Sequence, residues 1–274
     1  MKYLLITALV AAALLCIGYL LVLLAQRVMH RRWTRQVRFL LAAMLGVLGF
    51  LCSVAAYLGA YYHAGQEARH ALEGTADVRV TAIEQGYLFD GPGERTAVVF
   101  LPGAKVASEA YAPLMLRIAS GGSDCVLVDP PAHFSLMAGG ALDRTFASHQ
   151  YDHWILAGHS LGGIVASSYA TSHPGLVDGL VLLASYPTKQ VEGRIKALSI
   201  YGSEDAVLDL PAFEKARELL PTNAKVLRML GANHAHFGDY GAQDGDGIAT
   251  IGQREQWDET AEAVIGLARE IEME

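Results

Sequence analysis

The chain has 274 residues, of which 52% are hydrophobic and 18% are charged, and its formal net charge is −7. This acidic balance, without a basic patch in the C-terminal part, argues against a nucleic-acid partner. The apolar excess is concentrated in the first sixty or so positions, so the average composition combines two different objects. Residues 77–274 have the length of one α/β domain, and nothing in the sequence indicates the oligomeric state.

Two long uncharged segments open the chain, at about residues 3–25 and 39–62, and each is long enough to cross a bilayer as a helix. The short connection between them is rich in arginine: Arg27, Arg31, Arg32, Arg35 and Arg38. Positive charge of this kind predicts a cytoplasmic connection, with the N-terminus and the rest of the chain on the other side of the membrane. We therefore expect residues 1–62 to form a transmembrane α-hairpin that anchors the protein in the cell membrane.

A cleaved signal peptide is the alternative for the first apolar segment. That segment is longer than an ordinary signal core, and no small-x-small cleavage site precedes Arg27. Cleavage would also leave the second segment in place. Residues 63–76 are polar and are expected to link the anchor to the domain at 77–274.

Strands and helices are expected to alternate along this domain. The expected strands are a hairpin at 77–89 and apolar runs at 96–101, 125–128, 154–157, 179–184, 195–201 and 225–230. The expected helices lie at 108–119, with Ser108 as a cap, and at 142–149, 161–173, 210–220 and 253–271. This alternation predicts an α/β fold with a mostly parallel sheet and helices on both faces. Ligands in such folds bind at the carboxyl edge of the sheet.

The sequence GHSLG at 158–162 lies between an expected strand and an expected helix, and a third glycine follows at Gly163. A turn this tight forces Ser160 into a strained backbone conformation that exposes its hydroxyl group. Glycines flank the serine because side chains there would collide with the neighbouring strand and helix. This context predicts a nucleophile elbow with Ser160 as the nucleophile.

A serine hydroxyl becomes a good nucleophile only when a base takes its proton and an acid orients that base. The segment GSED at 202–205 follows one expected strand, and GANH at 231–234 follows a later one. Both segments therefore place candidate partners at the edge of the sheet where Ser160 is expected.

The chain resembles the α/β-hydrolase superfamily and, more narrowly, bacterial dienelactone-hydrolase-like members of the alpha/beta hydrolase fold-5 type. The resemblance covers about residues 96–250 and rests on the segments PGAKVASEAYAPL, GHSLGG, LLASYP, IYGSEDAV and GANHAHFGDYG in that order. It implies Ser160 as nucleophile, Asp205 as acid and His234 as base. It does not imply which ester or amide is cleaved.

The acid and the base each have competitors. Glu204 and Asp209 are alternatives for the acid, and Asp205 is favoured because it sits three residues beyond the glycine of the turn. His236 is the alternative for the base, and the GANH context favours His234. His236 is then expected to be a pocket residue.

A tetrahedral intermediate also needs hydrogen-bond donors for its oxyanion. One is expected to be the backbone N–H of Leu161, which follows the nucleophile. The other is expected from the loop after the strand at 96–101, with Ala104 preferred and Lys105 as the alternative. Lys105 is also the cation expected near the pocket mouth.

Two more histidines are candidate pocket residues. His159 precedes the nucleophile, where packing and a local hydrogen bond are the alternative explanation. His133 follows a Pro-Pro pair, and a surface position is at least as strongly expected for it.

A metal site is the alternative to this hydrolytic site. The candidate ligands are His234, His236, Asp239, Asp244 and Asp246. Their spacing matches neither a zinc motif nor an EF-hand loop, so no metal and no cofactor are expected.

Only residues 185–194 join the expected strands at 179–184 and 195–201, which leaves no room for the helical lid that lipases insert there. The pocket is therefore expected to be open and to favour small or short-chain substrates. The sequence predicts a membrane-anchored, carboxylesterase-like serine hydrolase that acts on an ester, thioester or lactone through an acyl-enzyme, with its catalytic domain outside the cytoplasm. The alternatives are an acyltransferase with the same triad and a non-catalytic binding relative.

Overall fold

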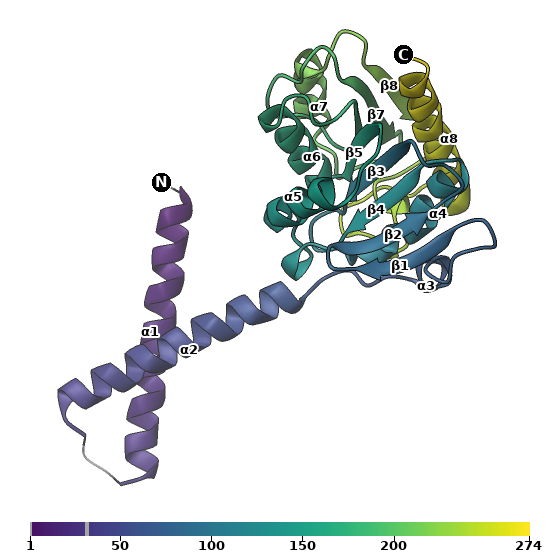
Figure 1. Ribbon diagram of the computed structural model, residues 1–274. Coiled ribbons are helices and arrows are strands. Elements are labelled where there is room, and N and C mark those ends of the chain that lie inside the picture. The colour runs from purple at the N-terminus through teal and green to yellow at the C-terminus, as the bar shows by residue number, and fades with distance from the viewer. Residues whose placement is uncertain (1, 31–32) are drawn as a thin grey trace. The chain divides into compact units, whose positions relative to one another are not determined.

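A computed structural model describes residues 2–30 and 33–274, with side chains at 13–30, 33–57 and 59–274. The chain forms two compact units, Met1–Ala60 and Tyr61–Glu274 (Figure 1). The first contains two helices, and the second contains a sheet with its covering helices.

The helices of the first unit are α1 (Lys2–Val28) and α2 (Arg35–Gly59). In α2, Arg35–Tyr57 is long and apolar enough to cross a membrane by length and composition, with a mean hydropathy of 2.4. Only 11% of this stretch is buried, whereas a helix in a protein core is mostly covered.

The expected first span, residues 3–25, coincides with part of α1, but the side chains of residues 3–12 lie outside the described residues. The described apolar part of α1 is Ala13–Val28. Arg31 and Arg32 of the expected cytoplasmic connection also lie outside the described residues. A span in α1, and with it the two-span hairpin and its orientation, therefore stays a prediction.

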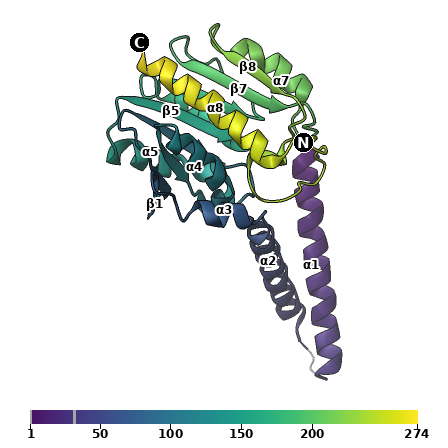
Figure 2. The same cartoon turned by 90° about the vertical axis from the view of Figure 1, so that its right-hand side faces the viewer.

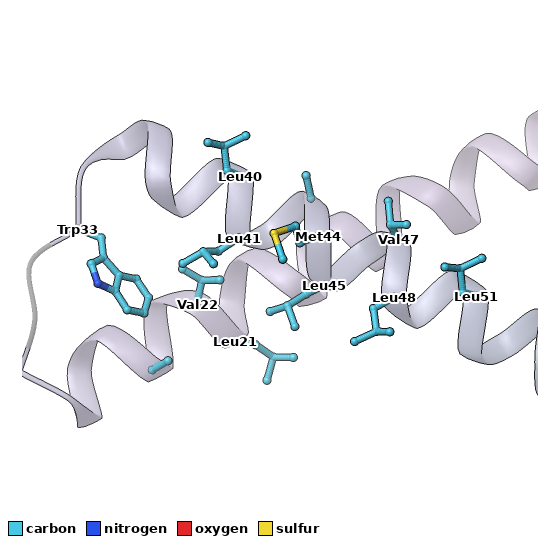
Figure 3. Close-up of a pocket in the computed structure, with 12 residues that line it drawn as sticks. Leu21, Val22, Trp33, Leu40, Leu41, Met44, Leu45, Val47, Leu48 and Leu51 are labelled. Carbon is cyan, nitrogen blue, oxygen red and sulfur yellow. The ribbon is translucent and has the colours of Figure 1, made fainter.

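Small residues bring the two helices of this unit close together. A Cβ atom on Gly18 would lie 2.7 Å from the carbonyl oxygen of Ala42. Beside this contact is a groove of about 700 Å³ lined by apolar side chains, including Val22, Leu41 and Met44 (Figure 3). An apolar surface of this kind is suited to contact with hydrocarbon.

The second unit is built on eight strands. They are β1 (Arg79–Ile83), β2 (Gly86–Asp90), β3 (Thr96–Leu101), β4 (Asp124–Val128), β5 (His153–His159), β6 (Gly179–Leu183), β7 (Lys196–Gly202) and β8 (Lys225–Met229). They form one sheet in the order β1-β2-β4-β3-β5-β6-β7-β8. The pairs β1–β2 and β2–β4 are antiparallel, and the others are parallel. The predicted α/β fold with a mostly parallel sheet is confirmed.

Strand β3 shows why both faces of the sheet are covered. Val98 and Phe100 belong to the core on one face, while Ala97, Val99 and Leu101 belong to the core on the other. Successive side chains of a strand point to opposite faces, so an uninterrupted apolar run requires cover on both.

The covering helices are α3 (Gln66–Ala71), α4 (Ala112–Ser120), α5 (Gly139–Ser148), α6 (Leu161–Ser172), α7 (Leu210–Ala216) and α8 (Gln253–Glu272). Helices α4 and α8 lie on one face of the sheet (Figure 2). Their side chains belong to the core on that face, and those of α5 and α6 belong to the core on the other. Short 3-10 helices occupy Ser108–Tyr111, Pro131–His133, Ser135–Met137, Arg217–Leu219 and Ala235–Phe237.

The helix expected at 108–119 differs from the observed structure at its start. A 3-10 turn, Ser108–Tyr111, precedes α4, and Ser108 does not cap it. The hydroxyl of Ser108 instead donates to Oδ1 of Asp129 at 2.9 Å. Ser108 therefore bonds to a residue that follows β4 instead of capping the helix.

Residues that follow α2 are hydrogen-bonded into the domain. The N–H of Tyr62 donates to the carbonyl of Lys105 at 2.7 Å, and the N–H of Ala107 donates to the carbonyl of Tyr62 at 2.9 Å. Further along, the N–H of Ala68 in α3 donates to the carboxylate of Asp239 at 2.8 Å. The segment expected to be a linker thus includes a helix bound to the domain.

Two glycine substitutions should have opposite effects on stability. A Cβ on Gly162 would collide with the carbonyl oxygen of Leu101, so Gly162→Ala should lower the free energy of unfolding by about 1–3 kcal/mol. Gly266 in α8 is exposed, with no neighbouring atom within 4 Å, so Gly266→Ala should raise it by up to about 1 kcal/mol. Chemical denaturation of both variants measures the difference, and equal stabilities would contradict this packing.

Candidate active site

Ser160 occupies the sharp turn between β5 and α6. Its φ is 53° and its ψ is −121°, a region that residues other than glycine rarely adopt. Its N–H donates to the carbonyl of Leu183 at 2.9 Å, and its own carbonyl accepts from the hydroxyl of Ser185 at 2.7 Å. Both bonds come from β6 or the residues just after it, so the neighbouring strand holds the turn in its strained form.

The three glycines near Ser160 have no room for a side chain. A Cβ on Gly158 would collide with the main chain of Gly162, and one on Gly162 would collide with the carbonyl of Leu101. A Cβ on Gly163 would lie 2.5 Å from the hydroxyl oxygen of Ser185. The strand and helix therefore approach as closely as the sequence motif predicts.

His234 and Asp205 form a buried pair. Their side chains are 2% and 1% exposed, and Nδ1 of His234 lies 2.9 Å from Oδ2 of Asp205. The other carboxylate oxygen accepts the N–H groups of Val207 at 2.9 Å and Leu208 at 2.8 Å. A carboxylate with these donors fixes the imidazole with its proton on Nδ1. Nε2 of His234 is then the basic nitrogen, and it has no hydrogen-bond partner among the described residues.

The structure places the competing acids elsewhere. Glu204 is exposed and accepts a hydrogen bond from the hydroxyl of Ser203 at 2.8 Å. Asp209 caps α7, where its carboxylate accepts from the N–H of Ala212 at 3.0 Å. Of these three acids, Asp205 is the one that meets His234.

His236, the alternative base, lies on a separate cavity of about 360 Å³ that Asn233 and Gln253 also line. Burial lowers the pKa of His236, and the nearby charge of Asp246 opposes this shift. Its N–H donates to the side-chain oxygen of Asn233 at 3.0 Å. His236 is thus adjacent to the buried pair without belonging to it.

His159 connects His234 to the loop after β3. Its ring centroid lies 4.4 Å from that of His234, and its Nδ1 lies 2.8 Å from the hydroxyl of Tyr111. That hydroxyl oxygen accepts the N–H of Gly103 at 3.0 Å, so its own proton points to Nδ1. Burial, followed by the proximity of His234, holds the pKa of His159 well below its usual range. A neutral His159 therefore stands between Ser160 and the loop.

The same loop carries the expected oxyanion donors. The N–H of Gly103 is bonded to Tyr111, and the N–H of Lys105 donates to the carbonyl of His133 at 2.8 Å. Ala104 lies between these two residues, and its N–H stays the predicted second donor. Leu161 is the first residue of α6, where N–H groups have no partner within the helix.

His133 lies beside this loop, on the side where the chain enters the domain. Its φ is 54°, and its ring contacts that of Tyr61 at a tilt of 31°, with centroids 3.8 Å apart. The expected pocket residues Lys105 and His133 are therefore neighbours through the main-chain bond between them.

Asp246 has a role that the sequence did not reveal. Its Oδ1 accepts the N–H groups of Ala206 and His234 at 3.3 Å and of Gly247 at 2.8 Å, and its Oδ2 accepts the N–H of Ala235 at 2.8 Å. One carboxylate thus joins the loop of Asp205 to the loop of His234. From the sequence, Asp246 is a candidate only for metal binding. Its Asp-Gly-Asp-Gly setting is typical of a turn carboxylate, and only the fold identifies its partners.

Comparisons with known proteins agree with this fold. A family model described as "Alpha/beta hydrolase family" matches residues 97–258. A hydrolase structure from Thermoplasma acidophilum, described as a predicted CIB-like hydrolase, has 14% identity and a TM-score of 0.53, and the match covers 69% of this chain and 98% of that one. No curated protein matches the sequence.

Two further solved structures are similar. A monoacylglycerol lipase from Paleococcus ferrophilus has 16% identity and a TM-score of 0.50, over 69% of this chain and 99% of the lipase. A laboratory-evolved variant of potato epoxide hydrolase has 12% identity and a TM-score of 0.51, over 71% of this chain and 100% of the hydrolase. At these identities the likeness is one of fold.

Removal of the Asp246 carboxylate should loosen both loops of the site. Asp246→Ala leaves four N–H groups without their shared acceptor and should lower the free energy of unfolding by about 2–3 kcal/mol. It should also slow the reaction of Ser160 with an electrophilic serine probe. Asp244→Ala, at an exposed position in the same loop, is the matched control and should change neither quantity. If both variants behave alike, Asp246 does not position the site.

The buried His159 should make stability dependent on pH. Its pKa in the folded chain lies below the ordinary value of 6.5, so the unfolded chain binds more protons between the two values. Stability should therefore be full above pH 6.5 and fall as the pH is lowered toward the folded pKa. His159→Gln, whose amide oxygen can accept from Tyr111, should lose less stability between pH of about 8 and about 5 in denaturant titrations. An unchanged loss would contradict the assignment.

Proposed function

The chain belongs to the alpha/beta hydrolase family, and on this premise we propose that it is a serine hydrolase whose triad is Ser160, Asp205 and His234. The observation that carries the proposal is the buried His234–Asp205 pair, with a distance of 2.9 Å, in a fold that also holds Ser160 at a positive φ. Ser160 directly follows His159, whose ring is in contact with that of His234.

The proposed reaction begins when Nε2 of His234 takes the proton of the Ser160 hydroxyl. The serine oxygen attacks the carbonyl carbon of the substrate, and the N–H groups of Leu161 and Ala104 bind the oxyanion that forms. The imidazolium, stabilised by Asp205, then protonates the leaving alcohol or thiol as the acyl-enzyme forms. Water, deprotonated by the same histidine, releases the acid and restores Ser160.

We propose a small or short-chain ester, thioester or lactone as the substrate. Support comes from the connection between β6 and β7, which occupies only residues 184–195 and leaves no space for an inserted lid domain. An uncovered site of this kind holds a compact acyl group.

We propose that residues 1–62 anchor the enzyme in the cell membrane with two spans, and that the arginine-rich connection is cytoplasmic. Helix α2 supports this proposal because its apolar side chains are exposed along its length. The catalytic domain is then extracytoplasmic, and its partners are the membrane and a small acyl substrate.

A fluorophosphonate probe tests the triad, because it reacts only with an activated serine. The wild type and the control Ser172→Ala, a serine exposed on the same helix, should be labelled. Ser160→Ala should not be labelled, and His234→Ala should react at least about a hundredfold more slowly, because the general base is removed. Labelling that persists in Ser160→Ala would refute the proposed nucleophile.

A further inference from the structure

The chain enters the domain with almost no slack after α2. Helix α2 ends at Gly59 with Ala60 as its cap, and Tyr61 already belongs to the domain unit. The next residue, Tyr62, is hydrogen-bonded on both sides of its peptide to Lys105 and Ala107. Chain continuity alone therefore limits how far this part of the domain lies from the end of α2.

The limit can be stated as a length. The three Cα–Cα steps from Gly59 to Tyr62 span at most about 11 Å, and neighbouring paired strands lie about 5 Å apart. The main chain of Lys105 is thus within about 16 Å of the last residue of α2, whatever direction the helix takes. Each headgroup layer of a bilayer is about 5–8 Å thick. With α2 in the membrane, this loop lies at the membrane surface.

The loop so placed belongs to the proposed site. Lys105 directly follows Ala104, the proposed oxyanion donor. Gly103, on the other side of Ala104, is bonded to Tyr111 and through it to His159. The site is therefore at the edge of the domain that the chain enters, and not on the opposite face.

A second loop extends this edge. The carbonyl of His133 accepts the N–H of Lys105, and its ring contacts that of Tyr61. The hydroxyl of Ser135 donates to the carbonyl of Pro102 at 2.6 Å. These bonds fix residues 131–138 against the oxyanion loop and the entry segment.

This second loop presents apolar side chains to its surroundings. Leu136 is 60% exposed and Met137 is 56% exposed, although Ser135 and Ala138 on either side are fully buried. Exposure of two adjacent large apolar side chains on an otherwise well-fixed turn is costly in water and favourable at a bilayer interface. Tyr61 contacts His133 of the same loop, and tyrosine has an amphipathic ring of the kind enriched at that interface.

We propose that the edge formed by residues 102–105 and 131–138 rests on the bilayer, and that the enzyme takes its ester from an amphiphile held in that membrane. The inference rests on the proposed function, since it assumes both the Ser160 chemistry and the anchor. It adds that the substrate comes from the bilayer and not from solution. An anchor confines enzyme and amphiphile to the same surface and so raises their effective concentration.

The test uses the full-length protein in phosphatidylcholine vesicles and two butyrate esters. One is soluble 4-methylumbelliferyl butyrate, and the other is the same ester with a hexadecyl chain on the coumarin ring, which keeps it in the bilayer. The anchored ester should be hydrolysed at least about tenfold faster when it shares a vesicle with the enzyme than when it is in separate vesicles.

The double variant Leu136→Ser, Met137→Ser tests the edge itself. It should hydrolyse the anchored ester about tenfold more slowly and the soluble ester at the wild-type rate, because only the contact with the bilayer is lost. Leu230→Ser is the matched control, since Leu230 is 71% exposed but follows β8, the outermost strand of the sheet, which is separated from β3 and β4 by β5, β6 and β7.

The outcomes separate the two proposals. Absence of Ser160-dependent hydrolysis of the soluble ester would refute the serine hydrolase and the inference that rests on it. Two other results would overturn the membrane-facing edge and leave the hydrolase in place, provided that the soluble ester is hydrolysed. One is hydrolysis of the anchored ester at equal rates in shared and separate vesicles, and the other is a double variant that hydrolyses the anchored ester at the wild-type rate.

Discussion

The strained turn at Ser160 is the constraint on which the site depends. A non-glycine residue at a φ of 53° costs about 1–3 kcal/mol, so the surrounding structure has to hold it there. Strand β6 and Ser185 supply hydrogen bonds to its peptide groups, and three glycines let β5, α6 and the end of β3 approach one another. The central position of β5 in the sheet makes this possible, because a partner strand lies on each side.

The buried Asp205–His234 pair imposes a second requirement, since a charged carboxylate away from water needs several hydrogen-bond donors. Two main-chain N–H groups and the imidazole satisfy Asp205. Asp246 then joins the loops that carry Asp205 and His234. The site is therefore held by main-chain donors and carboxylates more than by side-chain packing, and its geometry depends on loops that follow three different strands.

Local patterns predicted the fold because its strands and helices are encoded locally. The run at Thr96–Leu101 is apolar at every position, and the structure buries it on both faces. Long-range partners could not be predicted this way: Asp246 bonds to Ala206, forty residues away in sequence, and Ser108 prefers Asp129 to its expected capping role. For the site, strand order brought Asp205 and His234 to one edge as expected, but the link from Gly103 through Tyr111 to His159 had no sequence signal.

The hydrogen bonds of Tyr62 and Asp239 determine where a soluble fragment of this protein can begin. A fragment that starts at residue 77, where the sequence expects the domain, would lose α3 and leave the carboxylate of Asp239 without its Ala68 donor. It would also expose the main chain of Lys105 and Ala107 beside the active-site loop. A fragment that starts at Tyr61 retains all of these bonds and removes only the apolar helices, so the two units separate between Ala60 and Tyr61.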